Sequence, residues 1–368
     1  MNKMIISNLI QRPLRSLISV TAIAVEVTLI LVIVGLAVGI LNDSKQRQSG
    51  IGADVMVKPP GSSNLMGVSG APVSVKVADI LRKQPHAVAV SPVITQLNTG
   101  GGSVEVLYGI DQPSFDAMSG GFHYIAGGPM TGPDDILVDD FIASSKHLKV
   151  GDTTEVLNHN FRVAGIVENG KGARKFMPIK TVQEMIGAVG KASIFYVKLD
   201  NPNNAPEFVA AVKKVPGMEN YSVQSIKEWL SLMTPENIPG FSAFINVVIG
   251  VSVCIGFIVI FQSMYTAVME RTREIGILKS MGASKGYIVR LILQESFVLA
   301  IAGILLGIVI SYASAYGIRT KVSTLRVFVQ PDWVLKAAII AVLGALLGAI
   351  YPAFRAAQKD PIDALAYE

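Results

Sequence analysis

Four long apolar runs stand out from the otherwise mixed pattern of hydrophobic and polar positions. They occupy residues 17–41, 241–269, 291–318 and 333–351. A helix needs about 20 residues, most of them apolar, to cross a bilayer. The first run contains a single charged residue, Glu26, and the second contains none. Four such runs in one chain predict a protein with four transmembrane helices, rather than four buried helices of a soluble core.

The first run has an alternative reading as a cleaved signal peptide, because Lys3, Arg12 and Arg15 precede it. The apolar core of a signal peptide is typically 7–15 residues long, and this run is longer. No A-x-A cleavage site follows it, since residues 42–45 read Asn-Asp-Ser-Lys. The pattern therefore favours a retained first transmembrane helix.

Lysine and arginine in the short loops predict the orientation, because they collect on the cytoplasmic side of a membrane. Ten lie in the two terminal flanks and in the loop 270–290. Four lie on the opposite side, in the loop 319–332 and at the start of the fourth run. Both termini, including the tail 352–368, are therefore predicted to be cytoplasmic. The long segment 42–240 is then extracytoplasmic.

Composition supports a membrane protein. Charged residues make up 16% of the chain, against about 25% in soluble domains, and the mean hydropathy is +0.48. The net charge is +5, yet residues 43–236 contain 18 basic and 19 acidic residues. The excess positive charge thus belongs to the membrane part, which argues against nucleic-acid binding. The single cysteine, Cys254, excludes a disulfide within the chain.

The extracytoplasmic segment reads as an α+β domain. Two strand–helix–strand units are predicted over residues 73–91 and 194–223, and a hairpin turn over residues 158–160. The Gly/Ser-rich segment 61–72 predicts a loop. Short runs rich in β-formers predict strands at residues 53–58, 104–108, 135–138, 154–157, 161–167 and 194–199.

Catalytic and metal-binding patterns are absent from the sequence. Its four histidines are scattered without metal-ligand spacing, and the pairs Asp134-Asp135 and Asp139-Asp140 read as solvated surface. A Walker A motif is also absent, so ATP cannot be bound by that route. We expect a chain that is no enzyme and that holds no metal or cofactor directly.

The run 270–284, ERTREIGILKSMGAS, is too charged for a membrane and too apolar for a simple linker. It predicts a short amphipathic helix that stops at Gly282, followed by a long helix capped by Ser284. Its apolar stripe consists of Ile275, Leu278 and Met281. A stripe that faces no lipid predicts a protein partner. The alternative is an interfacial helix that lies on the lipid headgroups.

These residues resemble a known family. The run 270–284 is similar to the signature of the FtsX/MacB family of ABC-transporter permeases, and residues 351–365 resemble the family's P-A-x-x-A-x-x-x-x-P-x-x-A-L tail. The N-terminal amphipathic segment 1–16 and the four-span layout resemble the family as well. The resemblance implies an α-helical membrane protein with four transmembrane helices plus one α+β extracytoplasmic domain like the MacB-type periplasmic core domain.

The resemblance further implies a permease subunit in the bacterial inner membrane. It would be seated on two copies of a separate ABC ATPase that holds ATP and Mg, as a homodimer or with a related permease, among membrane lipids. A periplasmic adaptor and an outer-membrane channel are further expected partners. The residues implied to couple to the ATPase are Glu270, Arg271, Arg273, Glu274, Ile275, Gly276, Leu278, Lys279, Met281 and Gly282.

The expected function is export or extraction of an amphipathic substrate, such as a lipid, lipoprotein, peptide or drug-like molecule. Two alternatives stay open: an FtsX-like signal transmitter that activates a cell-wall hydrolase, and an HrtB-like haem exporter. Glu26 bears on the second, because an ionisable residue deep in a span is a candidate functional site. It is either a substrate ligand or a packed, buried carboxyl.

Small-residue patterns at Gly35/Gly39, Gly303/Gly307 and Gly344/Gly348 allow close helix packing. The sequence leaves open whether the contacts lie within the chain or between two copies. Gln294 and Glu295 are expected to anchor packing near the cytoplasmic end of the third span.

Overall fold

The computed structural model describes residues 13–62, 70–98, 105–238, 240–321 and 327–359. The chain divides into two compact units. A helical unit comprises residues 1–40, 239–321 and 325–368, and an outer unit comprises residues 41–238 and 322–324. Most of the N-terminal segment expected to be amphipathic and the end of the cytoplasmic tail lie outside the described residues.

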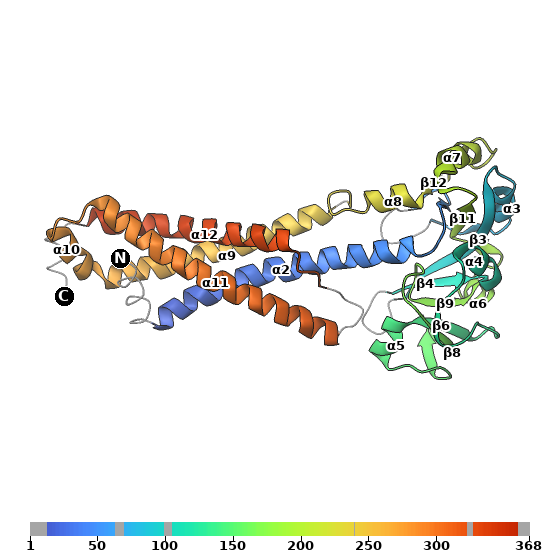
Figure 1. Cartoon of the computed structure of the whole chain (residues 1–368), viewed down its shortest axis with the longest axis horizontal. Coiled ribbons are helices and arrows are strands. Elements are labelled where there is room, and N and C mark those ends of the chain that lie inside the picture. Colours follow the sequence, from blue (N-terminus) through green and yellow to red (C-terminus); the bar gives the residue numbers. More distant parts are fainter. Residues whose placement is uncertain (1–12, 63–69, 99–104, 239, 322–326, 360–368) are drawn as a thin grey trace. The chain divides into compact units, whose positions relative to one another are not determined.

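In the described residues, the helical unit contains four long helices and a short one (Figure 1). The short helix, α10 (Thr272–Ser280), joins α9 (Phe241–Glu270) to α11 (Lys285–Lys321) at one end of the bundle. Each long helix is long and apolar enough to cross a membrane. The long helices are α2 (Pro13–Ser49), α9 (Phe241–Glu270), α11 (Lys285–Lys321) and α12 (Pro331–Gln358).

The long helices continue beyond the apolar runs that predict them. α2 runs past Leu41 to Ser49, and α12 runs past Tyr351 to Gln358. A helix does not end where its residues become polar, because its backbone hydrogen bonds continue until a breaker or a cap intervenes. As a consequence, the last turns of α2 belong to the outer unit.

Small residues bring the helices of the bundle together. Gly303 and Gly307 of α11 lie against Ile23, Ala24 and Val27 of α2. A Cβ on either glycine would collide with α2, so the close approach depends on glycine. Gly348 lies in tight contact with Phe257 and Ile260 of α9, and α12 buries a row of alanines that includes Ala337, Ala341, Ala345, Ala349 and Ala353. These described glycines therefore pack within one chain.

Side-chain hydroxyls add polar links between the helices. Ser19 of α2 and Ser263 of α9 share a hydrogen bond of 2.6 Å. Thr28 of α2 donates to the Gly307 carbonyl of α11 at 3.2 Å, and Ser296 of α11 donates to the Ala345 carbonyl of α12 at 3.0 Å. Together, the three bonds connect α2 to α9, α2 to α11, and α11 to α12.

The outer unit is built on a mixed sheet in the order β12-β1-β11-β3-β4-β9-β6-β8-β5, with β7 paired to β8. The pairs β4–β9 and β6–β8 are parallel and the other pairs are antiparallel. Its strands are β1 (Val55–Lys58), β3 (Ala87–Asn98), β4 (Glu105–Ile110), β5 (Tyr124–Gly127), β6 (Asp135–Asp139), β7 (Thr153–Val156), β8 (His159–Val167), β9 (Lys175–Pro178), β11 (Ile194–Leu199) and β12 (Ser222–Ser225).

Apolar side chains cover both faces of this sheet. Along β11, Ile194 and Tyr196 join one core, whereas Phe195 and Val197 join another. The alternation follows from the two-residue period of a strand. A small second sheet pairs β2 (Val73–Ser74) with β10 (Lys191–Ala192). The covering helices are α3 (Val77–Arg82), α4 (Gln112–Ser119), α5 (Asp140–Lys146), α6 (Ile179–Met185), α7 (Ala205–Lys213) and α8 (Ile226–Leu232).

All six strands predicted as short runs are present, as β1, β4, β6, β7, β8 and β11. The hairpin turn lies one residue earlier than expected. Leu157 and Asn158 both have positive φ, at 53° and 60°, and His159 already begins β8. Two consecutive positive φ values form the type of turn that matches the twist of a two-residue hairpin.

The prediction that the aspartate pairs lie on the solvated surface is wrong for two of the four residues. Asp135 and Asp139 are 2% and 1% exposed. Burial acts to raise the pKa of Asp135, but hydrogen bonds from Thr131, Gly132 and Arg162 outweigh it and lower the pKa to about 2. Both aspartates therefore belong to the folded interior of the outer unit.

Candidate functional site

The short helix α10 is the first candidate site. Gly282, with φ at 94°, ends the turn that follows α10. The Ser284 hydroxyl then accepts a hydrogen bond from the Tyr287 amide at 3.2 Å, which caps the start of α11. The predicted helix stop and the predicted cap are both present in the structure.

One end of α10 is tied to α11. Arg271 lies between α9 and α10, and its Nη1 donates to the two carboxylate oxygens of Glu295 at 3.1 and 3.3 Å. The two side chains are only 10% and 6% exposed. A buried ion pair of this kind is costly to break, because either partner alone would be left as an uncompensated charge. Glu295 is thus a packing anchor, as expected.

The other end of α10 is tied to α12. Lys279 donates from Nζ to the Ala357 carbonyl at 3.0 Å and also to the Lys359 carbonyl. A lysine at the C-terminal end of a helix satisfies carbonyls that have no partner within that helix. Arg271 and Lys279, for which the family resemblance implies a role in ATPase coupling, are therefore engaged in contacts inside the chain.

Two of the three residues in the predicted apolar stripe, Ile275 and Leu278, face the bundle, and the expectation that the stripe faces a partner is wrong for Ile275. That side chain is 9% exposed and packs in the bundle core with Val268, Ile288 and Ile292. Gly276 is buried, and the partly buried Leu278 packs on the same core. The ends of α9 and α11 provide an apolar surface of their own, and α10 covers it.

A different set of side chains points outward from α10. Met281 is 71% exposed and Ile277 is 43% exposed. Arg273 and Glu274 are also exposed, and in the part of the chain that the structure describes they form no hydrogen bond or ion pair. We call these four residues the outer face of α10. Ile277 is not among the coupling residues expected from the sequence. Its position four residues before Met281 nevertheless places both side chains on one side of the helix.

Glu26 is the second candidate. Its side chain lies in the middle of α2, 3% exposed, next to Gly256 of α9 and Gly344 of α12. A Cβ on Gly256 would overlap the carboxylate, so the two glycines form a notch that holds it. Glu26 Oε1 has no hydrogen-bond partner among the described residues. The structure thus places Glu26 inside the bundle of its own chain.

A third cluster joins the end of α2 to the outer sheet. Arg174, just before β9, donates to Asp43 of α2 at 3.0 and 3.1 Å and to Asp139 of β6 at 3.1 Å. Arg47 adds an ion pair to Asp43 at 3.2 Å. Burial raises the pKa of Asp139 to about 6, although Arg174 and the Ile142 amide act in the opposite direction.

Two buried tyrosines complete this cluster. The hydroxyls of Tyr108 on β4 and Tyr196 on β11 lie 2.9 Å apart. The amide of Gln48, in the last turn of α2, bonds to both hydroxyls at 3.2 Å. The last two turns of α2 are thereby fixed to β4, β6 and β11 and to the start of β9. Sequence reasoning missed this cluster, because its members lie far apart along the chain.

The chain matches two family profiles that together cover most of its length. The FtsX-like permease C-terminal family matches residues 246–361, and the MacB-like periplasmic core domain matches residues 16–215, more than half of the chain. The chain therefore belongs to the FtsX/MacB family of ABC transporter permeases and is a membrane protein. The resemblance seen in its motifs is confirmed.

Three curated relatives show how far the similarity extends. The macrolide export ATP-binding/permease protein MacB of Shewanella sp. is 25% identical over 96% of this chain and 58% of its own length. The uncharacterized ABC transporter permease YknZ of Bacillus subtilis is 36% identical over 34% of this chain and 32% of its own length. An uncharacterized ABC transporter permease of Methanocaldococcus jannaschii is 26% identical over 61% of this chain and 59% of its own length. The alignments thus span about a third to three fifths of these relatives.

Two solved structures are similar to about half of the chain. The periplasmic region of MacB from Actinobacillus actinomycetemcomitans is 19% identical, with a TM-score of 0.39. The match covers 52% of the present chain and 97% of the MacB region. The extracellular domain of the ABC-type transporter YknZ from Gram-positive bacteria is 13% identical, with a TM-score of 0.37. This match covers 47% of the present chain and 99% of the YknZ domain.

Proposed function

We propose that this permease couples ATP hydrolysis on a separate ABC ATPase to movement of its extracytoplasmic domain. The movement serves the export or extraction of an amphipathic substrate. One observation carries the proposal: α10 is fixed into the bundle at both ends, by Arg271 and Lys279, while its outer face stays exposed. A partner that moves α10 must therefore move the helices to which it is tied.

The outer face has the composition of a docking surface. Ile277 and Met281 supply exposed apolar contact, and Arg273 and Glu274 supply charges beside it. Methionine and arginine are enriched at protein interfaces, and methionine adapts its shape to a partner. We assign this face, instead of the stripe of Ile275 and Leu278, as the contact with the ATPase.

Force on α10 has a defined route through the bundle. The Arg271–Glu295 pair leads into α11, and Lys279 leads into the end of α12. α11 packs closely against α2 at Gly303 and Gly307. α2 is one continuous helix as far as Ser49, and its last turns are fixed to the sheet. A displacement of α2 therefore acts directly on the outer unit.

The expected assembly has two ATPase copies, and either two copies of this permease or this chain with a related one. Both termini and α10 are cytoplasmic in this proposal, as the distribution of lysine and arginine predicts. A periplasmic adaptor and an outer-membrane channel remain proposed partners. The amphipathic substrate class is supported by the similarity to macrolide exporters named MacB and by the apolar composition of the spans.

Of the two alternatives, haem export is the less favoured. A haem ligand at a membrane interface has to be accessible, whereas Glu26 is enclosed by α9 and α12 of its own chain. Signal transmission to a cell-wall hydrolase would use the same route through α10 and α2, with a different partner on the outer unit. Substrate movement in reconstituted vesicles distinguishes transport from transmission.

The coupling proposal is tested by ATP turnover of the permease–ATPase complex in nanodiscs. Glu274→Lys reverses a charge on the outer face and is expected to lower permease-stimulated turnover several-fold. Tyr316→Ala is the control, because Tyr316 is 73% exposed on α11 far along the chain from α10. Equal turnover in the wild type, Glu274→Lys and Tyr316→Ala, with the complex intact, contradicts the assignment of α10.

A further inference from the structure

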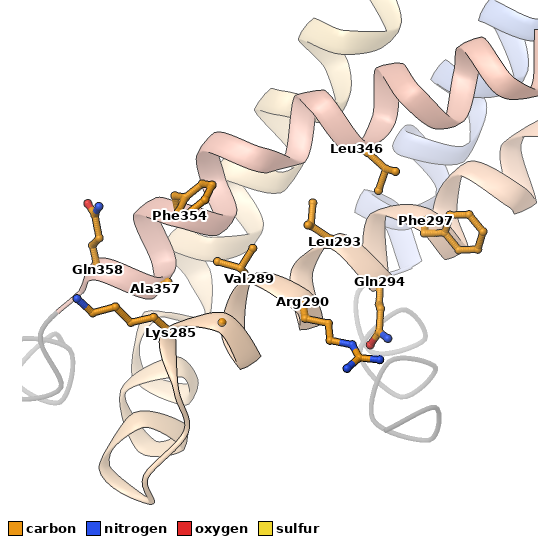
Figure 2. Close-up of a pocket in the computed structure, with 11 residues that line it drawn as sticks. Lys285, Val289, Arg290, Leu293, Gln294, Phe297, Leu346, Phe354, Ala357 and Gln358 are labelled. Atoms are coloured by element: carbon orange, nitrogen blue, oxygen red, sulfur yellow. The ribbon is translucent and has the colours of Figure 1, made fainter.

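A groove with a volume of about 750 Å³ lies between α11 and α12, near the end of the bundle where α10 joins α11 (Figure 2). Val289, Leu293 and Phe297 of α11 line one wall, and Leu346 and Phe354 of α12 line the other. Its volume lies within the range of small-molecule sites in proteins. None of these side chains takes part in the α10 or Glu26 sites.

Two cations contribute positive charge to the groove, Lys285 beside Gln358 and Arg290 beside Gln294 (Figure 2). Lys285 and Arg290 line it and are exposed, and no acidic residue contributes to the described lining. Neither cation has a hydrogen-bond or ion-pair partner within the ranges that the structure describes. Gln294, beside Arg290 in Figure 2, has a buried Oε1 that likewise lacks a partner. An apolar wall thus adjoins two cations and an unsatisfied amide.

We propose that this groove binds an anionic phospholipid of the leaflet nearest α10. The phosphate lies at Arg290, a glycerol or headgroup hydroxyl donates to Gln294, Lys285 adds positive charge where the groove meets the end of α12, and an acyl chain follows the apolar wall. Basic pockets between transmembrane helices recognise anionic headgroups through this combination of charge and apolar surface. In the proposed orientation, the leaflet is the cytoplasmic one.

The charge pattern favours a lipid over the other occupants. A second copy packed symmetrically on this face would place the two cations close to their own copies, because a two-fold interface uses the same patch twice. A free phosphate would use the cations but leave the five apolar side chains exposed. A phospholipid satisfies both parts of the groove, and it is present wherever helices of this length cross a membrane.

Native mass spectrometry of the purified full chain tests this proposal. The chain is equilibrated with equal amounts of phosphatidylglycerol and phosphatidylcholine of the same acyl composition. The wild type is expected to retain phosphatidylglycerol with roughly tenfold preference, as two cations near an anionic headgroup predict. The double variant Lys285→Gln/Arg290→Gln is expected to lose that preference. Arg319→Gln, which removes an exposed cation elsewhere on α11, is expected to keep it.

Two further measurements separate the groove from unspecific attraction. Leu293→Trp fills the apolar wall and is expected to reduce retention of phosphatidylglycerol with both cations present. Inorganic phosphate at the same concentration is expected to leave the lipid bound. The proposal is overturned by equal retention of both lipids in the wild type, by an unchanged preference in the double variant, or by displacement with inorganic phosphate. No ATPase is needed, so this outcome is independent of the coupling proposal.

Discussion

Arg174 of the outer sheet bonds to both carboxylate oxygens of Asp43 in α2, at 3.0 and 3.1 Å. The same guanidinium bonds to Asp139 with its other terminal nitrogen. Because Asp43 lies in the last turns of α2, this contact fixes the sheet to that end of α2 within the outer unit. Arg174 is therefore the residue through which the outer unit and α2 are expected to move together.

Replacing Arg174 by alanine is expected to destabilise the outer unit by about 3–5 kcal/mol, because the buried carboxylate of Asp139 loses its ion-pair partner and Asp43 keeps only Arg47. Thermal unfolding of the purified chain, followed by tryptophan fluorescence, measures the change. Arg82→Ala is the matched control. Its ion pair with Asp79 has side chains 47% and 66% exposed, so a loss of at most about 1 kcal/mol is expected. Similar losses in the two variants contradict the account of this cluster.

Stability is expected to depend on pH through Asp139. Its pKa is raised to about 6 by burial, so the folded protein holds the proton more tightly than the unfolded chain does. The resulting stabilisation is fully present below about pH 4 and is lost as the pH rises through 6. The contribution is about 3 kcal/mol.

The difference between the wild type and Asp139→Asn, measured from pH 4 to 7, isolates this contribution. Asparagine keeps the helix cap of α5 but does not titrate. Relative to the variant, the wild type is expected to lose stability as the pH rises. Asp135, whose pKa is lowered to about 2, contributes with the opposite sign, and its contribution is lost as the pH falls from about 4. Parallel curves for the wild type and Asp139→Asn rule out this role for Asp139.

The notch around Glu26 predicts a coupled pair of substitutions. Gly256→Ala is expected to cost about 1–3 kcal/mol, because its methyl group overlaps the Glu26 carboxylate. Glu26→Ala removes that overlap, so the double variant is expected to recover much of the loss. Unfolding temperatures of the two single variants and the double variant give the coupling. Additive losses would place Glu26 outside this notch.

The proposed orientation is tested by single cysteines in a Cys254→Ser background. Val189→Cys reports on the outer unit and Met281→Cys on α10, and both native side chains are highly exposed. A membrane-impermeant maleimide applied to intact spheroplasts is expected to label the first site, and to label the second only after permeabilisation. Labelling of Met281→Cys in sealed spheroplasts would show that α10 lies outside the membrane, contrary to the orientation predicted from lysine and arginine.

The sequence is sufficient to predict the four spans and α10, because long apolar runs and an amphipathic turn between two breakers leave few alternatives. It did not reveal β9. That strand has only four residues and begins with Lys175, which reads as surface but is fully buried as the partner of Glu105. The ion pair becomes apparent only when β4 and β9 lie side by side.

The sequence alone also did not predict which side of α10 is buried against the bundle. Ile275 and Met281 share an apolar character, yet the bundle covers the first and leaves the second exposed. Which side a helix buries depends on the surface beside it, and that surface is formed by residues of α9 and α11 distant in sequence. For the same reason, the sequence revealed the small-residue glycine patterns but did not predict which helices of the same chain they contact.

In the proposed mechanism, ATP acts on the outer unit through α10. Hydrogen exchange of the backbone amides of β9, beside Arg174, tests it in the permease–ATPase complex with and without ATP. We predict that ATP changes the protection of β9 in the wild type. Glu274→Lys is expected to leave β9 unresponsive to ATP although the complex remains assembled. An identical ATP response in Glu274→Lys, or no response in the wild type, contradicts the account.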